Sequence, residues 1–270
     1  MAAPRKWIGS FLLGLPQPLR SLRNVPLLGN LAHRLSHRFL PADEKVWARV
    51  ERGSAEGLWL ELNPRTGQHY LHGEIEPAIQ EILLKKLKPG MVFYDLGANI
   101  GFFSLLAARL VGASGQVFSF EPDPEIASRL RRNIAKNGFI NDTVVEAGIW
   151  SSSGTVNFVA ADQSSPDRGV GKFVAGDAAS AGTPTRCVAL DDFVQSAPTP
   201  DVIKCDVEGA EIEVFRGAEK LLEARHPLIL CEMHSSENDR YLREYFARFG
   251  YGLESVDDLH VLAVPQLVAK

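Results

Sequence analysis

The stretch VFYDLGANIGFFS, residues 92–104, decides the fold of this chain of 270 residues. It begins with an apolar run that is typical of a buried strand, turns between Gly97 and Gly101, and continues as an apolar helix over 101–111. A strand that passes through a glycine turn into a helix places the N-terminus of that helix at the carboxyl end of the strand, where α/β proteins bind their ligands. The stretch therefore predicts both a parallel sheet and the edge that carries the site.

Strands and helices alternate along the rest of the chain. A helix over 77–87 precedes the central stretch, and apolar runs follow it at QVFSFEPD (116–123), TVVEAGI (143–149), DVIKCDVEGAE (201–211), PLILCEMH (227–234), YGLESV (251–256) and LHVLAV (259–264). The last two runs are typical of an antiparallel hairpin. We therefore predict a doubly wound, mainly parallel α/β sheet whose last strand is antiparallel.

Two further segments flank or interrupt this alternation. Residues 59–73 predict a hairpin with a turn at 63–67. Residues 160–184 are rich in Ser, Gly and Ala, and we expect either a lid over the site or a surface loop there. We expect a domain over 59–270 that follows an N-terminal arm over 1–58.

The arm is basic and partly helical in its sequence pattern. Residues 1–42 hold six Lys or Arg, and the first acid is Asp43. Its apolar run WIGSFLLGL, residues 7–15, is shorter than the roughly 20 residues that a membrane-spanning helix needs. We expect the arm to form a helix packed on the domain or a frayed tail, with an interfacial membrane anchor or an organelle-type leader as the alternative.

Composition excludes several classes of protein. A net charge of −4 gives no argument for nucleic-acid binding, and three cysteines without a C-x-x-C pair indicate neither a disulfide framework nor a zinc cluster. We expect a cytoplasmic protein, with membrane association through the arm as the alternative, and no dedicated metal site. The oligomeric state stays open.

A row of acids is expected at the carboxyl ends of the strands, namely Asp95, Glu121, Asp206 and Glu232. Like charges that gather in a crevice cost free energy unless a cationic or hydroxyl-rich ligand offsets them. The spacing G-x-x-x-G differs from the dinucleotide pattern G-x-G-x-x-G, and Asp95 would repel a diphosphate. S-adenosylmethionine has a sulfonium and an ammonium that suit Asp95, and ribose hydroxyls that suit Glu121.

With these motifs in order, FYDLGANIGFFSLLAA, FSFEPDPE, VIKCDVEGAEIEVFRGA and LILCEMH, the sequence over about 70–264 resembles the FkbM-type S-adenosylmethionine-dependent methyltransferases. The resemblance implies a Rossmann-like class I methyltransferase fold with a seven-stranded sheet. It also implies O-methylation of a small-molecule or glycan hydroxyl or carboxylate.

The resemblance assigns roles to residues of this chain. The methionine part would be held by Asp95, Gly97, Ala98, Asn99 and Gly101, with Glu76 near the amino group; the ribose would lie at Glu121 and Pro122, the adenine at Ala147 and Gly148, and Asp206 would border the cofactor. Glu76 and Asp206 have ordinary structural roles as alternatives, because acids often lie near the N-terminus of a helix.

A hydroxyl acceptor needs a general base, and His234 is the best candidate because the unperturbed pKa of a histidine lies near neutrality; a capping or supporting role for His234 is the alternative. Asp206, Glu208 and Glu232 are expected to orient the acceptor or to share the role of base. Together with His234, Asp206 and Glu232 would also suit Mg²⁺, which we do not favour. The alternative functions are a nicotinamide (NAD)-dependent oxidoreductase and a non-catalytic cofactor-binding module tethered to a membrane.

Overall fold

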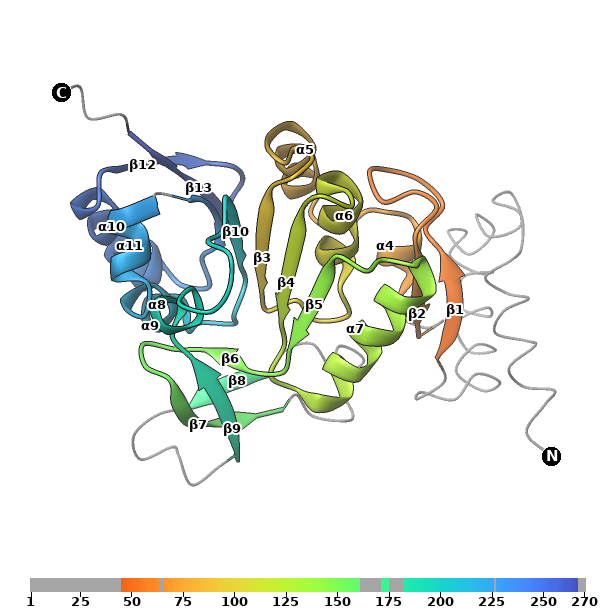
Figure 1. Ribbon diagram of the computed structural model, residues 1–270, viewed down its shortest axis with the longest axis horizontal. Coiled ribbons are helices and arrows are strands. Elements are labelled where there is room, and N and C mark those ends of the chain that lie inside the picture. Colours follow the sequence, from red (N-terminus) through yellow and green to blue (C-terminus); the bar gives the residue numbers. More distant parts are fainter. Residues whose placement is uncertain (1–44, 64–65, 161–170, 175–181, 226, 267–270) are drawn as a thin grey trace, which may run out of the picture. The chain divides into compact units, whose positions relative to one another are not determined.

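The computed structural model describes residues 45–63, 66–160, 171–174, 182–225 and 227–266 (Figure 1). The chain divides into two compact units, one formed by 1–75 with 163–167 and the other by 76–162 with 168–270. The division falls after Ile75, whereas the sequence predicted a boundary after residue 58. All the predicted site residues belong to the second unit.

The first unit contains a small antiparallel sheet, formed by β1 (Val46–Arg49) and β2 (Trp59–Leu62), and the short helix α4 (Gln68–Leu71). The predicted hairpin over 59–73 is therefore wrong in its second strand. The backbone N–H of Gly67 donates to the carbonyl of Asn63 (2.8 Å), which turns the chain into a helix instead of a strand. The predicted arm includes β1, and residues 1–44 lie outside the described part of the chain.

The second unit is built on a sheet of seven strands. In spatial order they are β12 (Tyr251–Ser255), β13 (His260–Pro265), β11 (Leu228–Glu232), β10 (Val202–Cys205), β3 (Val92–Leu96), β4 (Gln116–Phe120) and β5 (Asp142–Val145). Only β13 runs antiparallel to its neighbours, β11 and β12. This order confirms the predicted mainly parallel sheet with an antiparallel last strand.

The helices of this unit begin and end at residues that the sequence marks. They are α5 (Pro77–Lys86), α6 (Phe102–Val111), α7 (Pro124–Asn137), α8 (Leu190–Phe193), α9 (Glu211–Arg216), α10 (Glu219–Arg225) and α11 (Ser236–Arg248). The carboxylate of Asp123 accepts hydrogen bonds from the first turn of α7, and Gly138 ends that helix in the left-handed region. These caps fix where each helix leaves the sheet.

Both faces of the sheet are covered. On one face α6 packs against β3, β4 and β5 and touches α5 and α7 (Figure 1). On the other face Tyr94 and Phe120 belong to one buried cluster with Phe215 of α9 and Phe246 of α11. Burial of each such aromatic side chain stabilises the fold by about 1.5–3 kcal/mol.

A second sheet of four strands, β6 (Gly148–Ile149), β9 (Thr183–Val188), β7 (Gly154–Val159) and β8 (Lys172–Val174), follows β5 in the chain. The expected single strand over 143–149 is therefore split, because 148–149 pairs with β9. Within the predicted lid, 161–170 and 175–181 lie outside the described residues, and the part between them forms β8.

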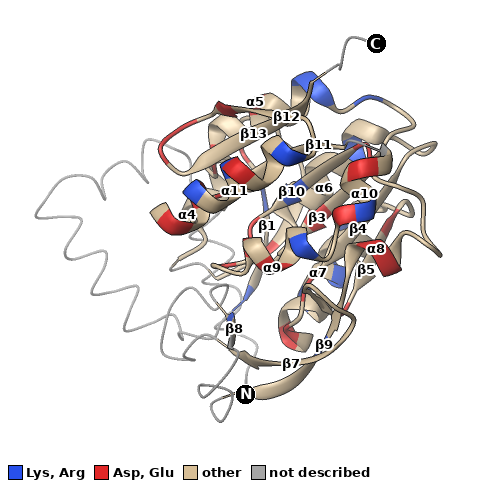
Figure 2. Ribbon diagram, turned by 90° about the vertical axis from the view of Figure 1, so that its left-hand side faces the viewer, with Lys and Arg blue, Asp and Glu red and all other residues tan. Residues whose placement is uncertain are grey.

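Basic and acidic segments are interspersed over α7, α10 and α11 in the view of Figure 2. The concentrated acids of this unit lie instead at the carboxyl ends of the main strands, as described below. Among the described residues, no helix combines the length and the apolar character needed to cross a membrane.

Candidate active site

The turn between β3 and α6 depends on backbone shapes that few residues adopt. Gly97, Asn99 and Gly101 all have a positive φ (83°, 49° and 89°). A Cβ atom at Gly97 would overlap the carbonyl oxygen of Asp206, so only glycine lets the turn approach the end of β10. The backbone N–H groups of Gly97 and Ala98 donate to the carbonyl of Phe120, which ties the turn to β4.

Glu121 follows β4 and is buried beside that turn. Its Oε2 accepts a hydrogen bond from the backbone N–H of Asn99 and its Oε1 accepts one from that of Asp123, both at 2.9 Å. Burial raises the pKa of the Glu121 carboxyl to about 8, although these two donors oppose the shift. Each oxygen keeps a lone pair that a ligand hydroxyl can use.

A cleft of about 630 Å³, including its open mouth, lies next to Glu121. Its walls include seven of the predicted cofactor-binding residues: Gly97, Asn99, Glu121, Pro122, Ala147, Gly148 and Asp206. Glu208, predicted to act on the acceptor, also lines it. The cleft is also lined by two aromatic side chains of the second sheet, Phe158 and Phe173. These two were not predicted, because local sequence does not show that β7 pairs with β8.

Four predicted cofactor residues do not line this cleft: Glu76, Asp95, Ala98 and Gly101. Asp95 is 1% exposed and accepts a hydrogen bond from the hydroxyl of Ser104 (2.6 Å). Burial raises the pKa of its carboxyl, although Lys204 opposes the shift. Its Oδ1 has no hydrogen-bond partner among the described residues, so the acid stands behind the cleft with one oxygen unused.

Lys204 is a buried cation that sequence reasoning missed. It is 4% exposed, its Nζ lies 3.1 Å from Oδ2 of Asp206, and it lies over the ring of Phe103. Burial disfavours its charge, but Asp206, Glu76 and Asp95 together raise its pKa. A lysine inside the apolar run VIKC was the available signal, because a lysine is rarely buried without acidic partners.

His234 lies among carboxylates beyond the end of β11. Its Nδ1 is 2.6 Å from Oε1 of Glu211 and its Nε2 is 3.3 Å from Oε2 of Glu208. Hydrogen bonds to Glu208 and then Glu211 raise the pKa of the imidazole to about 11. A raised pKa favours the protonated imidazole, which supports the positioning role for His234 over the role of general base.

Glu211 contacts His234 at the site, although its sequence position indicated only an acid in the first turn of a helix. It lies in the first turn of α9, where an acid would ordinarily face solvent, but it is fully buried. Besides the contact with His234, its Oε1 accepts from the backbone N–H of Gly209 (2.9 Å). The structure thus forms a row Glu208–His234–Glu211 that begins at the cleft and ends in the core.

The remaining predicted residues, Glu76 and Glu232, meet at the end of β11 together with His260, the first residue of β13. Nε2 of His260 is 3.4 Å from Oε2 of Glu76 and 3.7 Å from Oε2 of Glu232. Asp206 and His234 lie on the other side of Glu232, with Nε2 of His234 at 3.8 Å from its Oε1. The structure therefore brings all four predicted catalytic residues to one edge of the sheet.

Comparison with known proteins gives a consistent result. The family model of the methyltransferase FkbM domain matches residues 95–253. The chain is 30% identical over 164 residues to the hexuronic acid methyltransferase AglP of Haloferax volcanii, an overlap of 59% of this chain and 63% of that protein. It is 35% identical over 107 residues to the 31-O-demethyl-FK506 methyltransferase FkbM of Streptomyces tacrolimicus, an overlap of 38% and 36%.

Among solved structures, the methyltransferase FkbM from Methylobacillus flagellatus matches 68% of this chain and 50% of its own, with a TM-score of 0.47 and 19% identity. The chain spans less than two thirds of the length of these relatives. The family model covers more than half of the chain and includes the turn after β3 and the acids after β4, β10 and β11. The chain therefore belongs to the FkbM methyltransferase domain family.

Proposed function

We propose that this chain transfers a methyl group from S-adenosylmethionine to an oxygen atom of a small molecule or a glycan. The observation that carries the proposal is a single cleft whose walls include both Glu121 and Glu208. Family membership supports the reaction, and the names of two relatives, a hexuronic acid methyltransferase and a 31-O-demethyl-FK506 methyltransferase, support this class of acceptor.

The residues of the cleft fit this cofactor. The two free lone pairs of Glu121 suit the two neighbouring hydroxyls of a ribose. Ala147 and Gly148 are small and buried, which suits an adenine. We assign the methionine part to the turn at Asn99, with Asp95 behind it as an acid whose Oδ1 has no hydrogen-bond partner among the described residues and which favours a cation.

When bound, S-adenosylmethionine supplies a methyl group on a positively charged sulfur. The chain's own task is to align the acceptor oxygen and, for a hydroxyl, to take its proton. We assign the proton to Glu208, because it lines the cleft and its side chain is more exposed than that of Asp206, the other acid at the end of β10. His234 acts as a positioning residue that donates to Glu208.

The experiment measures methyl transfer from labelled S-adenosylmethionine to hexuronic acids, glycans and hydroxylated macrolides. With a hydroxyl acceptor, Glu208→Gln should lower kcat by at least about 100-fold, because general-base catalysis contributes that much. Glu213→Gln is the matched control, since Glu213 pairs with Arg216 on α9 and does not line the cleft. Binding of NAD in place of S-adenosylhomocysteine would overturn the proposal.

A further inference from the structure

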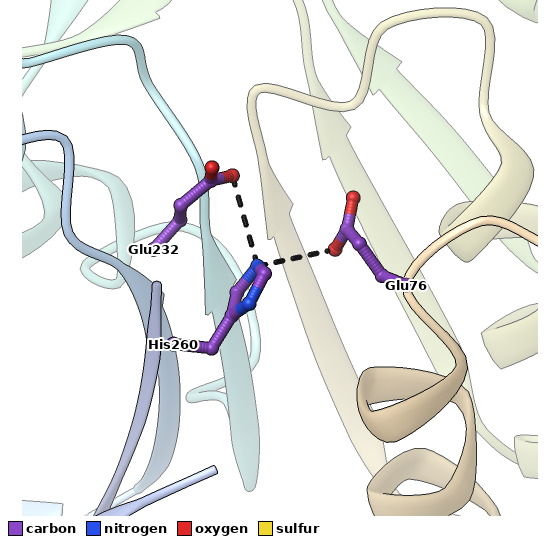
Figure 3. A group of neighbouring side chains, drawn as sticks. All are labelled: Glu76, Glu232 and His260. Carbon is purple, nitrogen blue, oxygen red and sulfur yellow. Dashed lines mark ion pairs between the residues drawn. The ribbon is translucent and has the colours of Figure 1, made fainter. Parts of the chain in front are cut away.

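Glu76, Glu232 and His260 form a cluster that the methyl-transfer proposal does not use. The three side chains come from the residue before α5, the end of β11 and the start of β13, and both carboxylates point toward the ring of His260 (Figure 3). One ligand atom from each lies within 4.8 Å of the other two. Sheet register fixes two of them, because Glu232 and His260 are direct neighbours across β11 and β13.

The imidazole has a hydrogen-bond partner at one nitrogen and only longer contacts with carboxylates at the other. Nδ1 of His260 lies 2.8 Å from Oδ1 of Asp257, so it is the nitrogen that carries a proton. Nε2 is buried and makes no hydrogen bond within the described residues, and the same holds for Oε2 of Glu76. His260 itself is 6% exposed. A carboxylate that holds one ring nitrogen while the other faces further ligands is the arrangement found around metal-binding histidines.

The spacing also fits an ion better than a hydrogen bond. Contacts of 3.4 and 3.7 Å from Nε2 to the two glutamates exceed the usual 2.7–3.2 Å of an N–H···O bond. Ligand atoms bound at about 2.1 Å to one tetrahedral metal ion lie about 3.4 Å apart. Three carboxylates, from Glu76, Glu232 and Asp257, surround the one imidazole, so a cation would relieve their repulsion.

Glu76 has a strained backbone conformation, which indicates that surrounding contacts hold it in place. Its φ of 36° and ψ of 66° lie in the left-handed region, and the next residue is Pro77. This conformation costs a non-glycine residue about 1–3 kcal/mol, which persists only when surrounding contacts require it. The strained residue directs its carboxylate inward, and its Oε2 is buried.

We propose that Glu76, Glu232 and His260 bind one divalent first-row transition-metal ion, such as Mn²⁺ or Zn²⁺. One imidazole with two carboxylates suits these ions better than Mg²⁺, which prefers oxygen ligands and water. The ion would share Glu232 with the neighbouring cluster of Asp206 and His234. Its binding does not depend on methyl transfer and holds for any function of the cleft.

The test is calorimetric titration of the metal-free full chain with Mn²⁺, Zn²⁺ and Mg²⁺, without cofactor or acceptor. We expect one Mn²⁺ or Zn²⁺ per chain and a loss of affinity of at least about 10-fold in Glu76→Gln and His260→Gln. Asp257→Asn should weaken binding about 10-fold, whereas its exposed neighbour variant Asp258→Asn should not. His234→Gln separates this cluster from that of Asp206, Glu232 and His234, and should retain binding.

Three results would overturn the proposal: no binding of either transition metal by the wild-type chain, unchanged affinity in both Glu76→Gln and His260→Gln, or loss in His234→Gln alone. Should a variant fail to fold, the anomalous signal of Mn²⁺ in wild-type crystals decides, because the peak must lie between the three side chains. Binding of S-adenosylhomocysteine, measured separately, shows whether the cofactor proposal stands when the metal proposal fails.

Discussion

Glu121 is the residue on which the cofactor assignment depends most. If its carboxylate accepts two ribose hydroxyls, Glu121→Gln replaces a charged acceptor by a neutral amide and loses about 1.5–3 kcal/mol, or roughly 10- to 100-fold in affinity for S-adenosylhomocysteine. Calorimetry measures the change. Glu125→Gln is the matched control, because Glu125 is exposed on the first turn of α7 and does not line the cleft. Equal affinity in both variants would show that Glu121 does not hold the ribose.

The raised pKa of Glu121 makes the same binding dependent on pH. Burial raises the pKa of the free protein's carboxyl to about 8, and hydroxyl donors favour the ionised form. Binding below pH 8 therefore requires loss of a proton, so affinity should rise from pH 6 to 8, by at most about 10-fold per unit. Titrations across this range should show the slope in the wild-type chain and a flat response in Glu121→Gln. A slope retained in the variant would assign it to another group.

Individual residues differ in how far the sequence could place them. Asp95, Glu121, Asp206 and Glu232 follow buried strands, and their convergence at one edge could be predicted from that alone. The raised pKa of His234 could not, because it depends on contacts with Glu208 and with Glu211, whose inward orientation is a matter of packing. His260 could have been predicted but was missed. An antiparallel last strand begins at the edge where the parallel strands end, so its first residue lies beside Glu232.

The strand–turn–helix element around Gly97 permits a prediction with a close control. Gly97→Ala adds a methyl group that overlaps the carbonyl of Asp206, whereas Gly138→Ala meets nothing within 4 Å at a similar positive φ. Both variants pay about 1–2 kcal/mol for the left-handed backbone. Gly97→Ala must also separate the turn from β10, so we expect a larger loss of stability in urea unfolding and a loss of S-adenosylhomocysteine binding. Equal stability of the two variants would contradict this role.

Elements were predicted best where a cap or a buried run marks them. Asp123 and Gly138 bound α7 as expected, since both act through their own backbone neighbourhood. The hairpin over 59–73 failed because β2 pairs with β1, a strand that precedes it by ten residues or so and lay inside the predicted arm. Pairing partners are chosen by burial across the fold, and local sequence carries little of that information.

Along the sequence, the residues assigned to the site and the residues of the basic arm occupy separate segments. All residues assigned to cofactor, acceptor or metal lie between Glu76 and His260, whereas the six Lys and Arg of residues 1–42 precede them. The arm's charge keeps contact with an anionic membrane surface as the alternative to a helix packed on the domain or a frayed tail, and each cation would contribute up to about 1 kcal/mol to such a contact. The sequence suggested this contact through charge alone, and charge does not specify a fold.

Deleting residues 1–44 tests whether the site binds its cofactor without the arm and whether the arm is needed for contact with a membrane. Binding of S-adenosylhomocysteine should change by less than about 2-fold, a difference well below 1 kcal/mol, because no assigned site residue is removed. Sedimentation with vesicles that contain phosphatidylserine should be lost, and the full chain should also release at high salt, where screening shortens the reach of charge to about 3 Å at 1 M. Neutral phosphatidylcholine vesicles are the control. Equal sedimentation of both chains would reject the membrane contact, and a 10-fold loss of cofactor affinity would mean that the arm supports the site.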